Sequence, residues 1–165
     1  MTYEIDIQND SNFPVGEARL REAALTALAH QETPDGSALT IVVTSNEEVA
    51  ALNRQYRDVD APTDILSFPA DEPPVTIPDE PPYLGDLIIA FPYASAQAER
   101  EGHVLDDSLA LLVVHGCLHL LGYDHDTPEA RAGMWATQEA ILRTLHIPAH
   151  YLPALEGGLD DDEIH

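Results

Sequence analysis

The sequence predicts an α+β fold, in which a small four-stranded mixed sheet packs with about five helices. Two observations support this prediction. Short β-branched or alternating segments recur along the chain, and longer segments with helical apolar spacing lie between them. The chain has 165 residues, of which 44% are hydrophobic, which suits one domain with its own core. We expect this domain to span residues 1–150 and an acidic, disordered tail to follow at 151–165.

Four segments have the composition and spacing of strands. Residues 3–7 alternate between apolar and polar side chains, as in a half-buried strand, and residues 39–44 (LTIVVT) form a β-branched run. Two further strands are expected at 64–68 (DILSF) and 84–91 (LGDLIIAF). The order of these strands in the sheet does not follow from the patterns.

Two helices are expected in the first part of the chain. One begins after Pro14 and ends near His30. The other begins at Ser45, because Ser45 and Glu48 match the S-x-x-E capping box. The apolar stripe of this second helix is expected to comprise Val49, Leu52 and Tyr56.

Three more helices are expected in the second part of the chain. A short one spans 92–101, and a markedly apolar one follows, with Asp106 or Asp107 as its N-terminal cap. The last begins after Thr127, a capping residue with a proline directly behind it, and continues to about Leu145.

A proline-rich segment separates the third and fourth predicted strands. Residues 69–82 contain six of the 13 prolines, with acidic residues between them. Proline fixes φ and lacks a backbone N–H, so this segment can neither extend a sheet nor form a helix. A loop of this length is either functional or a mobile linker, and the sequence leaves both open.

Three histidines lie close together in the segment HGCLHLLGYDH, at 115–125. Positions i and i+4 of a helix share one face, about 5–6 Å apart, so His115 and His119 can bind one ion. Gly122 stands where helices commonly end in a left-handed residue, after which the chain can present His125. Imidazoles in so apolar a segment need partners that offset their desolvation, and a metal ion is the simplest one.

Three imidazoles with an open fourth position are typical of a catalytic zinc site. We therefore expect one Zn²⁺ ion bound by His115, His119 and His125, on a zincin-like helix that is buried against the sheet. The single cysteine, Cys117, lies on the opposite face of that helix, and one cysteine excludes an internal disulfide. We interpret the other histidines as ordinary core or surface residues: His30, His103, His146, His150 and His165.

The charge balance limits the possible partners. The chain has 30 acidic and 7 basic side chains, a net charge of −23, and no lysine. Because nucleic-acid affinity depends largely on neutralising phosphates, general polyanion binding is disfavoured and any RNA contact must be local. No apolar run reaches membrane-spanning length and the N-terminus lacks signal-peptide features, so we expect a cytoplasmic protein without a membrane partner.

The same histidine spacing occurs in the metzincin proteases, whose motif has a glutamate directly after the first histidine. Here that position is Gly116. Since that glutamate is the general base of the peptidase, the sequence disfavours proteolysis. A bound zinc can still lower the pKa of water towards about 7 and polarise a phosphoryl or carbonyl oxygen.

The segment HGCLHLLGYDH resembles the signature H-G-x-L-H-L-x-G-Y-D-H of the YbeY-type endoribonucleases, and every fixed position is met. Further similar blocks are LNRQYR and PTDILSFP within 52–69 and LGDL at 84–87, so the resemblance covers roughly residues 3–146. It implies that the 1–150 domain is a catalytic metallohydrolase: a zinc-dependent, single-strand-specific endoribonuclease that acts in small-subunit rRNA maturation and ribosome quality control.

The resemblance also implies roles for particular residues. His115, His119 and His125 would hold the zinc, and Arg57 matches the family's functionally important arginine. A guanidinium near a metal can pair with two oxygens of one phosphate, whereas the alternative is an exposed arginine at the end of its helix. The weaker candidates are Asp64, Asp86 and Asp124, of which the last either orients a histidine or stabilises the turn.

The reaction we expect is phosphodiester hydrolysis, in which Arg57 and the metal stabilise the developing charge. The proton acceptor stays open between His115, Asp124 and the activated water itself. Because the chain is poor in cations, we expect the small ribosomal subunit or a ribosomal protein to deliver the single-stranded RNA. Three other functions stay open: a zinc peptidase, a metal-dependent hydrolase of another phosphoester or amide, and a non-catalytic ribosome-assembly factor.

Overall fold

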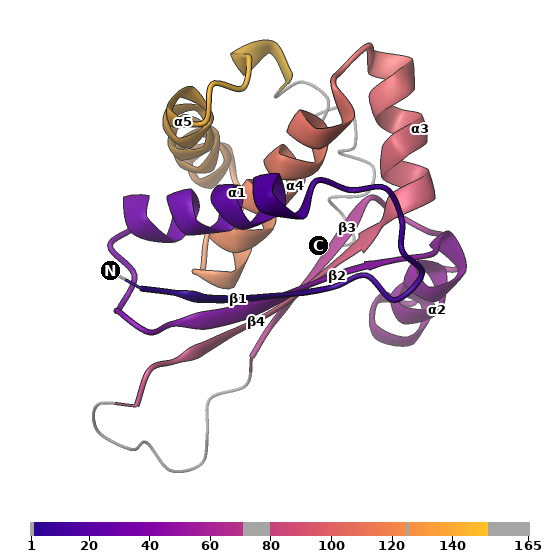
Figure 1. Cartoon of the computed structure of the whole chain (residues 1–165), viewed down its shortest axis with the longest axis horizontal. Helices are drawn as coiled ribbons and strands as arrows, with labels where there is room; N and C mark the ends of the chain where they lie inside the picture. Colours follow the sequence, from indigo (N-terminus) through magenta and orange to yellow (C-terminus); the bar gives the residue numbers. More distant parts are fainter. Residues whose placement is uncertain (1, 71–79, 125, 152–165) are drawn as a thin grey trace.

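The structure is a computed structural model that describes residues 2–70, 80–124 and 126–151 (Figure 1). The expected α+β class, with a four-stranded mixed sheet and five helices, is confirmed over these residues. In chain order the elements are β1 (Glu4–Gln8), α1 (Glu17–His30), β2 (Ala38–Thr44), α2 (Asn46–Arg57), β3 (Ile65–Pro69), β4 (Tyr83–Ala90), α3 (Phe91–Glu101), α4 (Leu105–Leu120), α5 (Pro128–Thr144) and the 3₁₀ turn η1 (Ala149–Tyr151).

The sheet has the order β1-β2-β4-β3. β1 and β4 both pair with β2 in parallel, and β3 pairs with β4 in antiparallel orientation. The predicted proline-rich loop joins these two antiparallel strands, but its residues 71–79 lie outside the described residues, as do the predicted tail residues 152–165.

Helices cover both faces of the sheet. Residues of α1 and α4 share one large core with the inward side chains of all four strands, and α5 packs behind them (Figure 1). A smaller core lies on the other face, where Val49 of α2 packs with Leu66 and Ala90. The alternation of side chains along β3 and β4 explains this arrangement, because Ile65 and Leu66 are both buried, on opposite faces.

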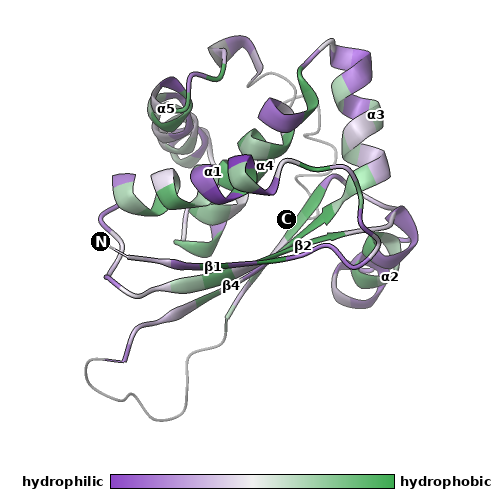
Figure 2. Ribbon diagram, in the orientation of Figure 1, coloured by the Kyte–Doolittle hydropathy of each residue, from purple (hydrophilic) through white to green (hydrophobic). Residues whose placement is uncertain are grey.

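α4 is the central helix of the larger core. Eleven of its 16 residues are buried, and Figure 2 shows hydrophobic colouring over much of its length and over the strands. A helix that is apolar on all sides must be enclosed by other elements. α4 can approach the sheet closely because Gly116 faces it: a Cβ there would lie 2.7 Å from Leu87 Cδ2 and 3.1 Å from Ile65 Cδ1.

Two of the predicted helix caps are confirmed. The Ser45 hydroxyl accepts a hydrogen bond from the backbone N–H of Glu48 at 3.2 Å, and the Thr127 hydroxyl accepts one from Ala130 at 3.1 Å. Both side chains satisfy a backbone donor that the first helical turn leaves without a partner, and thereby fix the starts of α2 and α5.

The predicted cap of α4 is wrong. The N-cap residue is Val104, and Asp106 and Asp107 lie inside the first turn. Asp106 accepts a hydrogen bond from the backbone N–H of Gly16 at 3.2 Å, and Asp107 forms an ion pair with Arg19 at 2.9 Å. These carboxylates therefore connect α4 to α1, while their charge still suits the positive end of the helix dipole.

The predicted apolar stripe of α2 is only partly buried. Val49 is fully buried, but Tyr56 is 61% exposed, and its ring lies edge-on to that of Phe68, with the ring centroids 5.3 Å apart. The buried position one turn after Val49 is Asn53, whose amide donates to the backbone carbonyl of Ala61 at 2.9 Å. This hydrogen bond connects the inward face of α2 to the loop that follows the helix.

Within the described residues, no single helix combines the length and apolar character needed to cross a membrane. α3 and α4 pass that test on length and composition only as a pair, bent by 117° at the break between them.

The contact between Gly116 and the sheet yields a first prediction. Gly116→Val should lower the free energy of unfolding by about 1–3 kcal/mol more than Gly133→Val, because the added atoms overlap Leu87 and Ile65. Gly133 is the matched control, since it lies within α5 and a Cβ there meets nothing within 4 Å. Urea unfolding of both variants measures the difference. Equal losses would show that valine's helix propensity, rather than close packing, sets the effect.

Candidate metal centre

His115 and His119 lie one turn apart near the C-terminal end of α4, on the same face of the helix. Their ring centroids are 4.5 Å apart, and the two Nε2 atoms face each other at 3.0 Å. His115 is almost fully buried, with 4% exposure, whereas His119 is partly exposed. The structure thus brings together two of the three predicted ligands, at the boundary between the core and the surface.

The other nitrogen of each ring faces a carbonyl oxygen. His115 Nδ1 lies 2.7 Å from Gln138 Oε1, and His119 Nδ1 lies 3.0 Å from the backbone oxygen of Tyr123. A carbonyl oxygen can only accept, so each Nδ1–H donates and each Nε2 keeps a lone pair. Metal-binding histidines commonly use their second nitrogen in this way.

This donor set fits a metal ion. Two lone pairs that face each other at 3.0 Å repel unless a proton or a cation lies between them. In a tetrahedral zinc site with Zn–N bonds of about 2.0–2.1 Å, two ligand nitrogens are separated by about 3.3 Å. The observed separation is close to this value, so a small movement of either ring would accommodate zinc.

The third predicted ligand, His125, lies outside the described residues. The turn that leads to it is described and has the predicted form. Gly122 has a φ of +101°, and the backbone N–H of Tyr123 donates to the carbonyl of Leu118 at 2.9 Å, which ends the helix. Within the described residues, no group of three or more His, Cys, Asp or Glu side chains is placed to hold a metal ion.

A cleft of about 300 Å³ adjoins His119. It lies between the ends of α2, β3 and α4, and its described lining residues are Arg57, Ser67, Pro69, His119, Gly122, Tyr123 and Asp124. Arg57 is the only cationic side chain in that lining. Its half-buried position lowers the pKa of the guanidinium, because the charged form loses solvation. A desolvated cation on a cleft wall favours an anionic ligand.

The three weaker aspartate candidates lie in different places. Asp124 lines the cleft beside His119. Asp86 lies on β4 and accepts a hydrogen bond from the Tyr83 hydroxyl. The neighbours of Asp86, Gly85 and Leu87, face α4, so its own side chain points to the opposite face of the sheet.

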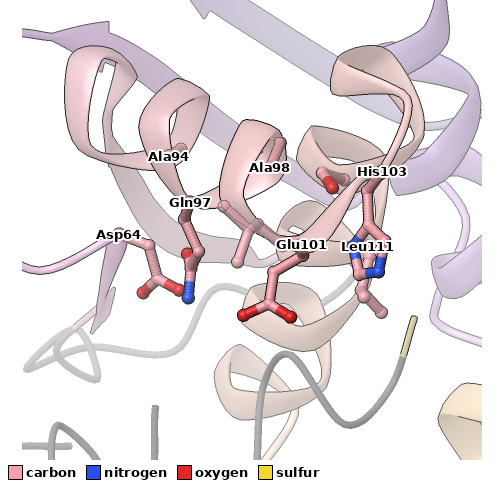
Figure 3. Close-up of a pocket in the computed structure, with 9 residues that line it drawn as sticks. Asp64, Ala94, Gln97, Ala98, Glu101, His103 and Leu111 are labelled. Carbon is pink, nitrogen blue, oxygen red and sulfur yellow. The ribbon is translucent and has the colours of Figure 1, made fainter. Parts of the chain in front are cut away.

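Asp64 lines a separate hollow between α3 and α4 (Figure 3). Figure 3 shows Asp64 beside Gln97 at one end, with Glu101 and His103 towards the other. The hollow measures only about 20 Å³, which is room for about one water molecule. Asp64 Oδ1 accepts a hydrogen bond from the backbone N–H of Ile65 at 2.7 Å, so this carboxylate helps to start β3.

Two residues of α5 that contact His115 were not predicted from the sequence. Gln138 is fully buried and accepts from its ring, and the Trp135 ring lies edge-on to it at a centroid distance of 6.0 Å. The available signal was a glutamine on the core face of an otherwise apolar helical stripe formed by Met134, Ile141 and Leu142.

Cys117, which the sequence placed on the opposite face of α4, is fully buried in the large core. Burial raises the pKa of its thiol to about 12, because the thiolate cannot be solvated there. A neutral thiol is a poor metal ligand, so this cysteine belongs to the packing of α4.

Known proteins resemble this chain over nearly its whole length. Residues 5–146 match the family model described as endoribonuclease YbeY. A protein of that name from Chloroflexus aurantiacus is 41% identical over 148 residues, which cover 88% of this chain and 96% of the relative. Another, from Moorella thermoacetica, is 46% identical over 151 residues, covering 84% and 95%.

A solved structure supports the fold. The solution structure of a Thermotoga maritima protein matches with a TM-score of 0.56 and 24% identity, covering 88% of this chain and 95% of that one. The family match includes α4, both described histidines, Arg57 and the strands that position them. The chain therefore belongs to the endoribonuclease YbeY family.

Proposed function

We propose that this protein is a zinc-dependent endoribonuclease, a cytoplasmic enzyme that cleaves single-stranded RNA in small-subunit rRNA maturation and ribosome quality control. Its family membership supports the RNA-hydrolysing activity. The observation that carries the proposal is the pair of Nε2 atoms facing each other beside a cleft that Arg57 lines. The catalytic domain would comprise residues 1–150.

The zinc ligands in this proposal are His115, His119 and His125. The hydrogen bonds at both Nδ1 atoms support the first two, because they direct the Nε2 lone pairs to one point. When bound, the zinc ion would supply an activated water and a Lewis acid for a phosphoryl oxygen.

Arg57 would bind the scissile phosphate. Its guanidinium can donate to two phosphate oxygens at once and would stabilise the negative charge that develops on them. Two features support this role: Arg57 shares the cleft with His119, and it forms no ion pair with any described residue. Burial removes part of the hydration of the Arg57 guanidinium, and hydrogen bonds to a phosphate would compensate for that loss.

Asp124, rather than His115, would accept the proton from the attacking water. His115 has one nitrogen directed at His119 and the other at Gln138, so neither is available as a base. Asp124 is exposed and lines the same cleft as His119, where solvent can carry the proton away. His115 would then contribute to catalysis as a ligand.

The surroundings of Gly116 argue against the peptidase alternative. A metzincin-type base would have to project from this position, but the side-chain direction at Gly116 is filled by Leu87 and Ile65. A glutamate side chain at this position would therefore point at the sheet rather than into the cleft. Hydrolysis of a phosphodiester, with Arg57 in the cleft, agrees better with the arrangement.

The acidic composition bears on how RNA reaches the site. With a net charge of −23 and Arg57 as the one cationic side chain among the described lining residues of the cleft, the protein has little long-range attraction for RNA. We therefore propose that the small ribosomal subunit or one of its proteins holds the substrate near the cleft.

The metal proposal predicts that His119→Ala abolishes both zinc binding and cleavage of single-stranded RNA. The variant would lack one of the two imidazole nitrogens that converge on the proposed metal site. His150→Ala is the matched control, because His150 is exposed in η1 and is not among the described lining residues of the cleft, so this substitution should leave both properties unchanged. Equal RNA cleavage by wild type and His119→Ala, with both proteins folded by circular dichroism, would refute the assignment.

The role of Arg57 predicts that Arg57→Ala lowers kcat by about 10²–10³-fold, as expected for loss of one group that stabilises transition-state charge. Zinc affinity should stay unchanged. Arg54→Ala serves as control, since Arg54 lies on the same helix but is exposed and pairs with Asp60 at 3.2 Å. Steady-state cleavage of a labelled single-stranded RNA measures the effect. An Arg57→Ala enzyme as active as Arg54→Ala would exclude phosphate binding at this residue.

The charge argument predicts weak binding of free RNA with a shallow salt dependence. For one or two phosphate contacts, the slope of log K against log salt for single-stranded RNA should be about −0.7 to −1.4. Fluorescence anisotropy at several salt concentrations, with the His119→Ala variant to prevent cleavage, measures this slope. Tight binding with a much steeper slope would mean that the isolated protein recruits RNA itself.

A further inference from the structure

Two side chains of α5 contact the ring of His115. The Gln138 amide oxygen lies 2.7 Å from His115 Nδ1, and the Trp135 ring lies edge-on to the imidazole, at an interplanar angle of 89°. Residues three apart on a helix share a face, so Trp135 and Gln138 reach the ring together. The ring of His115 is thus enclosed between α5 and His119.

The burial of Gln138 indicates why a glutamine is there. Its side chain is fully buried beside Met134, Ile141 and Leu142 on the core face of α5, where an apolar residue would pack without polar cost. Its Nε2 has no hydrogen-bond partner in the described part of the chain. Since the donor half of the amide is unused, the oxygen is the part of the side chain that the structure needs.

The two histidines differ in how they are held. His119 Nδ1 faces a backbone oxygen, that of Tyr123, which is present whatever side chain occupies that position. His115 Nδ1 depends on a side chain, so substitution of one residue can remove its acceptor. His115 is therefore the histidine whose tautomer can be changed selectively.

The geometry points to Gln138 as a positioning residue that holds His115 in the Nδ1–H tautomer, so that its Nε2 lone pair is available to the metal. A protonated Nε2 cannot bind a cation, and without the acceptor the proton is free to move to Nε2. Gln138 would thereby set the metal affinity of the site. This inference rests on the proposed function for the identity of the metal as zinc.

Zinc affinity in three variants tests the inference. In competition with a chromophoric chelator, Gln138→Leu should bind zinc about 10- to 100-fold more weakly than wild type, as is typical when the hydrogen-bond partner of a ligand is lost. Gln138→Glu should retain wild-type affinity within a few-fold, because a carboxylate also accepts from Nδ1–H. Met134→Ala controls for a damaged core, since Met134 is fully buried one turn earlier on α5.

Two results of this titration would overturn the inference. One is measurable zinc binding by wild type with an equal affinity in Gln138→Leu. The other is an affinity loss in Met134→Ala that matches the loss in Gln138→Leu, because core destabilisation would then account for both.

The imidazole tautomer in the metal-free protein provides an independent measurement. Long-range ¹H–¹⁵N NMR should place the His115 proton on Nδ1 in wild type and in Gln138→Glu, and shift it towards Nε2 in Gln138→Leu. If these tautomers are found but wild type binds no zinc, the role of Gln138 stands and the zinc assignment of the proposed function fails. A wild-type proton on Nε2 would overturn the role of Gln138 directly.

Discussion

The burial of α4 against the sheet is the constraint on which the rest of the structure depends. The helix is apolar on nearly every side, and Gly116 allows its backbone to approach Leu87 and Ile65 closely. The rings of His115 and His119 project from this tightly packed helix, and because they are desolvated there, each ring nitrogen needs a polar partner. The neighbours satisfy one nitrogen of each ring, and the remaining two converge at the edge of a cleft. The burial of α4 thus determines both the packing of the core and the positions of the two histidine rings.

Features that depend on neighbouring residues were predictable from the sequence. The caps at Ser45 and Thr127, the left-handed Gly122 and the i, i+4 relation of the histidines are determined within a few residues. The four strands were also predicted to within about two residues, because their β-branched composition contrasts with the helices around them. The family signature in the same segment then indicated the activity, which spacing alone left open between several metallohydrolases.

Features that depend on distant segments were not predictable in this way. Asp106 and Asp107 resemble capping residues, but they contact α1, which lies about 90 positions earlier. Tyr56 fits an apolar stripe by spacing, yet its side chain is 61% exposed and its ring lies edge-on to Phe68 of β3. Gln138 acquires its role only because α5 packs on His115, and the order of the strands likewise depends on contacts across the whole chain.

The strand order has a consequence for biosynthesis. In the described part of the chain, β2 pairs with β1 and β4 and β3 pairs with β4 alone, so the chain must reach Ala90 before this sheet can close. α4, which supplies much of the core, is made later still. Proteins dominated by such long-range pairings fold slowly, and domains generally fold as units during synthesis. A nascent chain of this protein would therefore expose its β-branched strands until late in translation, when β4 and α4 have both been made.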